Sequence, residues 1–125
     1  GKFSFDSGVA GGRRLFALKH RPTAIFAAND DTAAGVLWAA AECGLEVPRD
    51  VSVCGFDDIP LSRQVWPALT TVRQPSGDMG HIAATQLLST IKSGKPGQMV
   101  SVPYALRLRQ STGVVPKRVR AGRKE

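Results

Sequence analysis

The chain has 125 residues, of which 42% are apolar and 22% are charged, and its formal net charge is +7. This length and composition are typical of one globular domain with a buried core, and they exclude a largely disordered chain. No stretch approaches the run of about 18 apolar residues that a membrane-spanning helix needs, and no signal-peptide pattern opens the chain. We therefore expect a cytoplasmic protein that has no membrane partner.

The positive charge is concentrated in the last ten residues, "PKRVRAGRKE". Without them, 12 basic residues stand against 9 acidic ones, so the rest of the chain is nearly balanced. The segment has little apolar content, which favours a solvated, disordered terminus over weak nonspecific contact with nucleic acid phosphates.

Two phenylalanines alternate with polar residues in "KFSFDSG" at 2–8, which predicts a short strand that turns at its last three residues. A helix to about Lys19 should follow, although Gly11 and Gly12 weaken it by about 1 kcal/mol each. Its core-facing residues should be Val9, Leu15, Phe16 and Leu18. The apolar run "TAIFAA" then has the length of a buried strand.

The next segment, "DTAAGVLWAAAECG", is alanine-rich and acidic in its first turn, which predicts a helix capped by a left-handed Gly44. "DVSVCG" is another apolar strand. Strands that are apolar throughout and alternate with helices predict a parallel sheet covered on both faces, which is an α/β fold.

After these elements, the hydrophobic periodicity weakens. Apolar residues at helical spacing then predict a helix from about Ser76 to Ser93. Two late strands are predicted in "QMVSV" and "YALRLRQ". Apolar and charged residues alternate in the second, so one of its faces should be exposed. The alternating residues are Tyr104, Leu106 and Leu108 against Arg107 and Arg109.

The two cysteines, Cys43 and Cys54, lie in apolar sequence, which favours buried free thiols over a disulfide. His20 and His81 are far apart and should lie on the surface. No cysteine and histidine grouping has the spacing of metal ligands. The sequence therefore predicts no metal and no cofactor.

Amide and acidic residues stand directly after two predicted strands, in "AANDD" and "GFDD". In open parallel sheets, ligands bind in the crevice beyond the carboxyl ends of the strands. These groups could hydrogen-bond the hydroxyls or ring nitrogens of a small polar ligand. They could instead hold Mg²⁺ for phosphoryl transfer, or do acid–base work on a glycosidic bond.

Most of the polar residues in these two stretches could instead have a structural role. Asp30 or Asp31 could cap the following helix, which typically contributes about 1 kcal/mol, and Asp58 could fix a turn. Asn29 precedes the expected cap and can face the crevice, and a site role is favoured at Asp57 because no helix follows it directly. Phosphate-loop, dinucleotide-binding and nucleophile-elbow motifs are absent. The residues thus favour a ligand-binding domain over an enzyme.

Five stretches in register carry a family resemblance: "FSFDSG", "RPTAIFAANDDTAAGVL", "GLEVPRDVSVCGFDD", "PALTTVRQP" and "MGHIAATQLL". Together they resemble the effector-binding domain of lactose-repressor-like (LacI/GalR) transcription regulators, as far as about Gly113. The family pattern often has a tyrosine where Val9 stands here, a change that concerns packing more than recognition.

The resemblance implies a periplasmic-binding-protein-like fold, in which two Rossmann-like lobes clamp a small effector. It implies that most of the first lobe and the N-terminal helix-turn-helix are absent from this sequence. Residues 1–72 would form most of the second lobe, and residues 73–100 would cross into the first. Residues 101–114 would return to the second lobe, and 115–125 would form the basic tail.

By the same resemblance, Asn29, Asp57 and Gln74 match positions that hydrogen-bond the effector. Phe3 matches an aromatic residue that stacks on it, although Phe3 could equally belong to the core. The family pairs subunits through the helix after the Asn–Asp step, where Trp38 would anchor a homodimer or, alternatively, pack on the sheet. The interface positions are Ala34, Trp38, Ala41, Glu42 and Val65.

We therefore expect a non-enzymatic sensor whose ligand is a sugar or a nucleobase and which reaches operator DNA only through an N-terminal domain outside this sequence. The isolated chain should bind effector weakly and DNA only nonspecifically. The alternatives are a periplasmic-type sugar-binding protein and, less favoured, a carboxylate-dependent enzyme on a parallel sheet.

Overall fold

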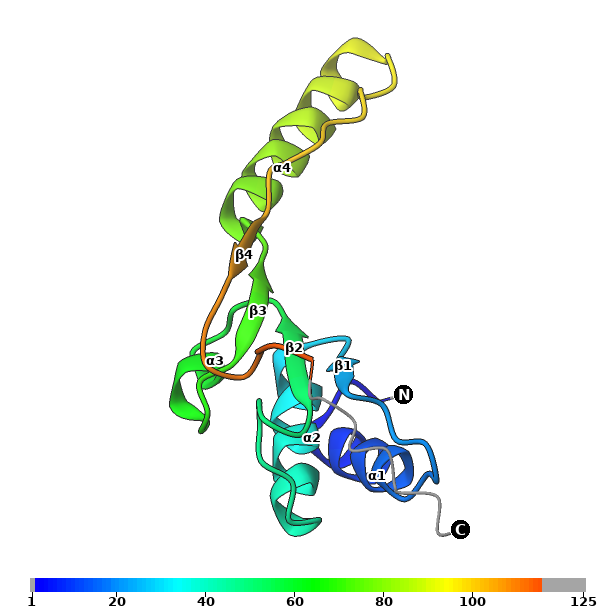
Figure 1. The fold of residues 1–125 in the computed structure, drawn as a ribbon. Helices are drawn as coiled ribbons and strands as arrows, with labels where there is room; N and C mark the ends of the chain where they lie inside the picture. Colours follow the sequence, from blue (N-terminus) through cyan, green and yellow to red (C-terminus); the bar gives the residue numbers. More distant parts are fainter. Residues whose placement is uncertain (1, 116–125) are drawn as a thin grey trace, which may run out of the picture.

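A computed structural model describes residues 2–115 as one small sheet with helices beside it and a long helix that extends away (Figure 1). Strands β1, β2 and β3 run parallel, and β4 pairs antiparallel with β3, so the sheet order is β1-β2-β3-β4. The predicted α/β fold with a mainly parallel sheet is confirmed, but the expected cover on both faces is wrong, because Phe26 of the first strand is 65% exposed. The elements are α1 (Phe5–Phe16), β1 (Ala24–Phe26), α2 (Asp30–Glu42), β2 (Ser52–Phe56), α3 (Leu61–Gln64), β3 (Thr70–Arg73), α4 (Ser76–Ser93) and β4 (Ala105–Arg107).

The core lies where α2 covers the sheet, because the alanine-rich face of α2 allows close approach to β2. Its central residues are Ala27, Ala33, Val36, Leu37, Val53 and Leu69. Gly44 ends this unit in the left-handed conformation with φ 68°, as predicted. The basic tail predicted from the sequence lies outside the described residues.

Helix α1 packs directly along α2, and glycine makes this possible. A Cβ added at Gly8 would lie 2.1 Å from the Thr32 carbonyl oxygen, and one added at Gly35 would lie 2.1 Å from the Phe5 carbonyl oxygen. The two backbones therefore touch at this crossing, and no side chain fits between them. Gly11 faces open space, with nothing within 4 Å of its added Cβ.

The predicted opening strand is wrong, because a helix cap takes its place. The Ser4 hydroxyl accepts from the Ser7 backbone N–H at 3.3 Å, and the Ser7 hydroxyl accepts from the Ser4 N–H at 3.1 Å. This reciprocal capping box starts α1 at Phe5, where alternation had suggested a strand. The helix also ends at Phe16 rather than near Lys19, which leaves Leu18 exposed.

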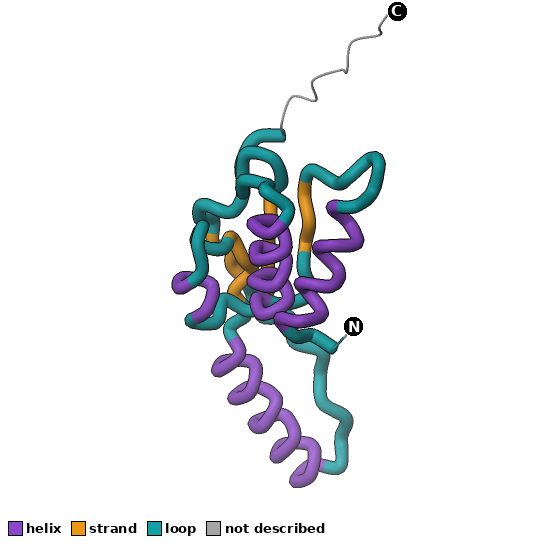
Figure 2. The backbone as a smooth tube through the Cα atoms, turned by 90° about the horizontal axis from the view of Figure 1, so that it is seen from below, coloured by secondary structure: helices purple, strands orange, loops and turns teal. Residues whose placement is uncertain are grey.

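Helix α4 has its predicted bounds and extends away from the rest of the structure (Figures 1 and 2). None of its side chains is buried, including Met79, Leu87 and Ile91. The chain returns beside it without regular structure, so the predicted strand "QMVSV" is wrong. Within residues 2–115, no helix combines the length and apolar character needed to span a bilayer.

Two further expectations about burial are wrong. Strand β4 ends at Arg107, so the alternation does not continue: Leu108 is exposed, and the Arg109 side chain is only 16% exposed. Cys43 is exposed at the end of α2, and Cys54 is half-buried. Both thiols are free, as predicted, and both histidines lie on the surface.

The helix crossing predicts opposite effects for two glycine substitutions in α1. Gly8→Ala should destabilise the chain by about 1–3 kcal/mol, because the methyl group has no space. Gly11→Ala should stabilise it by up to about 1 kcal/mol through helix propensity. Urea unfolding of both variants measures this difference, and shifts of the same sign would contradict the described crossing.

Candidate functional site

Asn29 starts α2 and also contacts Phe3. Its Oδ1 accepts from the Thr32 N–H at 2.9 Å, and its Nδ2 donates to the Phe3 carbonyl oxygen at 3.0 Å. Asn29 is therefore the helix cap, and the capping role expected for Asp30 or Asp31 is wrong. Two of the predicted effector-binding residues thus lie together at the end of β1.

Asp30 is fully buried and joins three segments. One carboxylate oxygen accepts from the Thr71 hydroxyl at 2.6 Å, and the other accepts from the Ile59 N–H at 2.9 Å. Burial raises the pKa of Asp30, and the two hydrogen bonds oppose that rise. Asp30 therefore fastens α2 to β3 and to the loop after β2, and it does not face solvent.

The loop after β2 has an uncommon backbone. Asp57 and Asp58 have φ angles of 108° and 58°, in the region that favours glycine. The Asp57 N–H donates to the Val72 carbonyl oxygen at 2.8 Å, and Asp57 Oδ1 accepts from Gln74 Nε2 at 2.7 Å. The structure thus brings together the other two predicted effector-binding residues, at the ends of β2 and β3.

Asp58 forms a buried ion pair with Arg109, and its side chain is only 3% exposed. The largest influence on the pKa of Asp58 is burial, which raises it, but the hydrogen bond and charge of Arg109, with help from Ser62, lower it overall. Arg109 was missed from the sequence because the alternation around it predicted a strand surface. No local signal marks it, since its partner lies 51 positions away.

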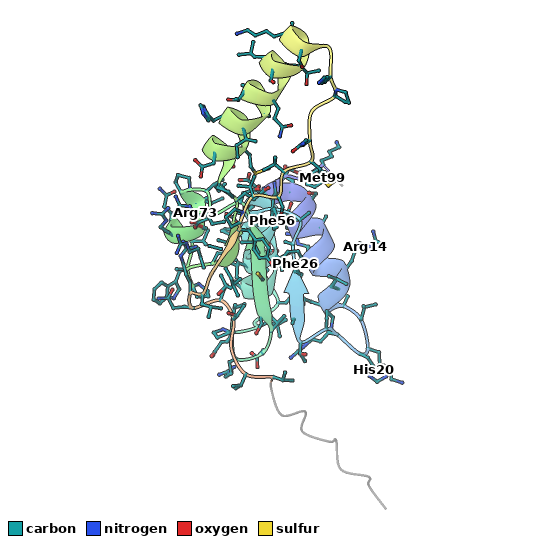
Figure 3. The ribbon with its side chains drawn as sticks, turned by 90° about the horizontal axis from the view of Figure 1, so that it is seen from above. Arg14, His20, Phe26, Phe56, Arg73 and Met99 are labelled. Carbon is teal, nitrogen blue, oxygen red and sulfur yellow. The ribbon has the colours of Figure 1, made fainter. Side chains whose placement is uncertain are left out.

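A cavity of about 660 Å³ opens beside Asp57 and Gln74. Figure 3 labels Arg73, which lines this cavity, and Phe56, which lines an adjacent apolar cavity of about 430 Å³. Neither Phe3 nor Asn29 lines either one. The polar lining residues of the larger cavity are Asp57, Asp58, Arg73, Gln74, Ser76, Asp78, Tyr104 and Arg107.

This lining can hydrogen-bond a polar ligand on several sides. Asp57 uses one carboxylate oxygen for Gln74 and has a second that can accept from a ligand hydroxyl, while Arg73 and Arg107 supply donors. Across residues 2–115, no three histidine, cysteine or acidic side chains converge on a possible metal position. The arrangement can bind hydroxyl or amide groups through alternating donors and acceptors.

The positions predicted for subunit pairing differ in exposure. Trp38 is 57% exposed and contacts Phe5 edge to face, with ring centroids 6.2 Å apart, so it does not pack on the sheet. Ala41 and Glu42 are also exposed, and Glu42 is paired with Arg13. Ala34 is only 3% exposed and Val65 packs partly against the core, so these two offer little area to a partner.

Residues 3–112 match the periplasmic binding protein-like domain family. This chain belongs to that family. It is 40% identical over 117 residues to the HTH-type transcriptional repressor PurR of Serratia proteamaculans, covering 93% of this chain and 34% of the relative. It is 38% identical to catabolite control protein A of Priestia megaterium, covering 90% of this chain and 34% of the relative. The chain thus spans about a third of the length of these curated relatives.

Solved structures of LacI-family regulators agree with this assignment. A LacI family regulator from Lactobacillus casei with bound glucose has a TM-score of 0.73 at 32% identity, covering 87% of this chain and 40% of that one. A transcriptional regulator CelR–cellobiose complex has a TM-score of 0.82 at 33% identity, covering 89% of this chain and 34% of that one. The resemblance to the LacI-type effector-binding domain is confirmed, and the named relatives are regulators rather than enzymes.

The buried contacts of Asp30 predict different outcomes for two substitutions. Asp30→Ala leaves the Thr71 hydroxyl and the Ile59 N–H without partners, which should cost about 1–3 kcal/mol for each group. Asp30→Asn should cost less, because an amide can accept from Ile59 and donate to the Thr71 hydroxyl. Urea unfolding at neutral pH compares them, and equal losses would argue against the network.

The Asp58–Arg109 pair predicts a pH dependence of stability. Since folding lowers the pKa of Asp58, its contribution is fully present above the ordinary value of 3.8 and is lost as pH falls through the lower folded value. The difference in unfolding free energy between the parent chain and Asp58→Asn should therefore shrink between neutral pH and about pH 3. A constant difference would show that the pair's charge does not stabilise the fold.

Proposed function

We propose that this chain is the effector-sensing and dimerisation core of a LacI-type transcriptional regulator. The observation that carries the proposal is the Asp57 carboxylate, which lines the large cavity and is held there by Gln74. Phe3 and Asn29 form a second contact group at the neighbouring strand end. We infer that the ligand binds against Asp57 and Gln74 and that the lobes close over it.

We further propose that the ligand is a sugar in preference to a nucleobase. A carboxylate, an amide and two guanidinium groups in one cavity suit a ring of hydroxyls, each of which both donates and accepts. Structural neighbours with bound glucose and with cellobiose support the same class. Phe3 lies outside this cavity, beside Asn29, and would supply an aromatic face to a sugar that extends across both strand ends.

The division into lobes is part of this proposal. Residues 1–72 and 101–114 would belong to one lobe, and residues 73–100 to the other. The absence of buried side chains in α4 supports this division, because an 18-residue helix with apolar positions needs a surface to pack on.

Regulation would couple the ligand to subunit geometry. Trp38, Ala41 and Glu42 present an exposed helix surface that could pair with a second copy, as in a homodimer. Effector binding would then shift the population of lobe arrangements and, through it, the operator affinity of an N-terminal DNA-binding domain in the longer protein. Such a regulator would act in the cytoplasm.

An amide NMR titration tests the ligand proposal, because chemical shifts detect weak binding. We expect glucose or cellobiose to shift the Gln74 side-chain and Asp57 backbone signals, and Asp57→Ala to abolish that response. Glu46→Ala removes an exposed carboxylate of the Arg49 ion pair and should leave the response intact. Shifts caused by MgCl₂ alone, or sugar shifts that survive in Asp57→Ala, would contradict the proposal.

A further inference from the structure

The direction of the Asp57 side chain depends on a strained turn. Two consecutive residues other than glycine, Asp57 and Asp58, have positive φ angles of 108° and 58°. Such a conformation persists only when surrounding contacts determine it. The contacts that hold this turn therefore decide whether the Asp57 carboxylate meets Gln74 at all.

Besides the Asp57 N–H bond to the Val72 carbonyl oxygen, these contacts come from two charged residues, the buried Asp30 and the partly buried Arg109. On one side, Asp30 accepts from the Ile59 N–H at 2.9 Å. On the other side, Arg109 pairs with the Asp58 carboxylate, which also accepts from the Ser62 hydroxyl at 3.2 Å. The Asp58 side chain thus binds Arg109 and Ser62, while the Asp57 side chain accepts a hydrogen bond from Gln74.

Arg109 itself is rigidly fixed. Its Nη1 donates to the Leu69 carbonyl oxygen at 2.7 Å and to the Ser62 hydroxyl at 3.1 Å, and its backbone N–H donates to the Thr70 hydroxyl at 2.9 Å. A planar guanidinium can make the two Nη1 bonds and the Asp58 contact together, which the single ammonium of lysine cannot. Arg109 does not line the cavity, so it has no direct contact with a ligand bound there.

We infer that Arg109 is a positioning residue for the ligand-binding carboxylate: through Asp58 it holds the left-handed turn that directs Asp57 to Gln74. The inference rests on the proposed function in that Asp57 is taken to contact the ligand. Arg109 lies on the segment that follows β4, far along the chain from the turn. A displacement of that segment would therefore move the Asp57 carboxylate through the Arg109–Asp58 ion pair.

The test uses the side-chain amide signals of Gln74 in the ligand-free chain, so it is independent of effector binding. Asp57→Ala, which lacks the hydrogen bond, defines the unbonded position of these signals. In Arg109→Met they should move to that unbonded position while backbone signals of α2 and β1 stay in place. The matched control is Arg13→Met, which breaks the exposed pair with Glu42 and should leave the Gln74 signals unchanged.

Gln74 signals that remain at the parent position in folded Arg109→Met would overturn the inference. If that variant does not fold, the double variant Asp58→Gly/Arg109→Met decides, because glycine adopts the left-handed conformation and no unpaired carboxylate remains. Parent-like Gln74 signals in the double variant support the inference. Gln74 signals at the unbonded position, or a double variant that also fails to fold, would overturn the inference, because Arg109 would then not act through Asp58.

Discussion

The arrangement of the site depends on Asp30, a fully buried carboxylate that does not line the ligand cavity. Asp30 accepts from β3 through Thr71 and from the loop after β2 through Ile59, so one side chain sets the spacing of three segments. Burial of a charge is unfavourable unless hydrogen bonds compensate it, and Asp30 has both of its oxygens engaged. The position of the loop that carries Asp57 follows from this constraint.

Close helix packing supplies the second constraint on the same region. Because Gly8 and Gly35 let the backbones of α1 and α2 touch, the capped start of α1 lies against the start of α2. This contact places Phe3 beside Asn29, whose amide donates to the Phe3 carbonyl oxygen. The two contact groups of the site are therefore positioned by backbone packing on one side and by buried charges on the other.

Elements with a strong local pattern were predictable from the sequence. The apolar strands β1 and β2, the alanine-rich α2 and the long α4 follow from periodicity and from glycine stop signals at Gly44 and Gly94. The start of α1 was not, because Ser4 and Ser7 form a capping box that alternation of the neighbouring phenylalanines hides. The edge strand β4 was placed correctly, but its end at Arg107 depends on tertiary contacts.

The sequence named the residues of the candidate site, and their role in ligand binding stays a prediction. Strand ends and the family resemblance indicated Asn29, Asp57 and Gln74, and the structure joins the last two by a hydrogen bond. The roles of Asp30 and Arg109 could not be derived from local patterns, since their partners lie 29 to 51 positions away. Tertiary contacts, rather than residue type, distinguish Asp57, which pairs with Gln74, from Asp58, which pairs with Arg109, and from Asp30, which accepts from Thr71 and Ile59.

If a left-handed turn presents the Asp57 carboxylate to a sugar, a crystal structure of the chain grown in saturating glucose or cellobiose should show that contact. We expect sugar hydroxyls on Asp57 and Gln74, with Asp57 at positive φ and Asp58 still paired with Arg109. A sugar bound elsewhere, or Asp57 relaxed to negative φ with its side chain turned from Gln74, would contradict it.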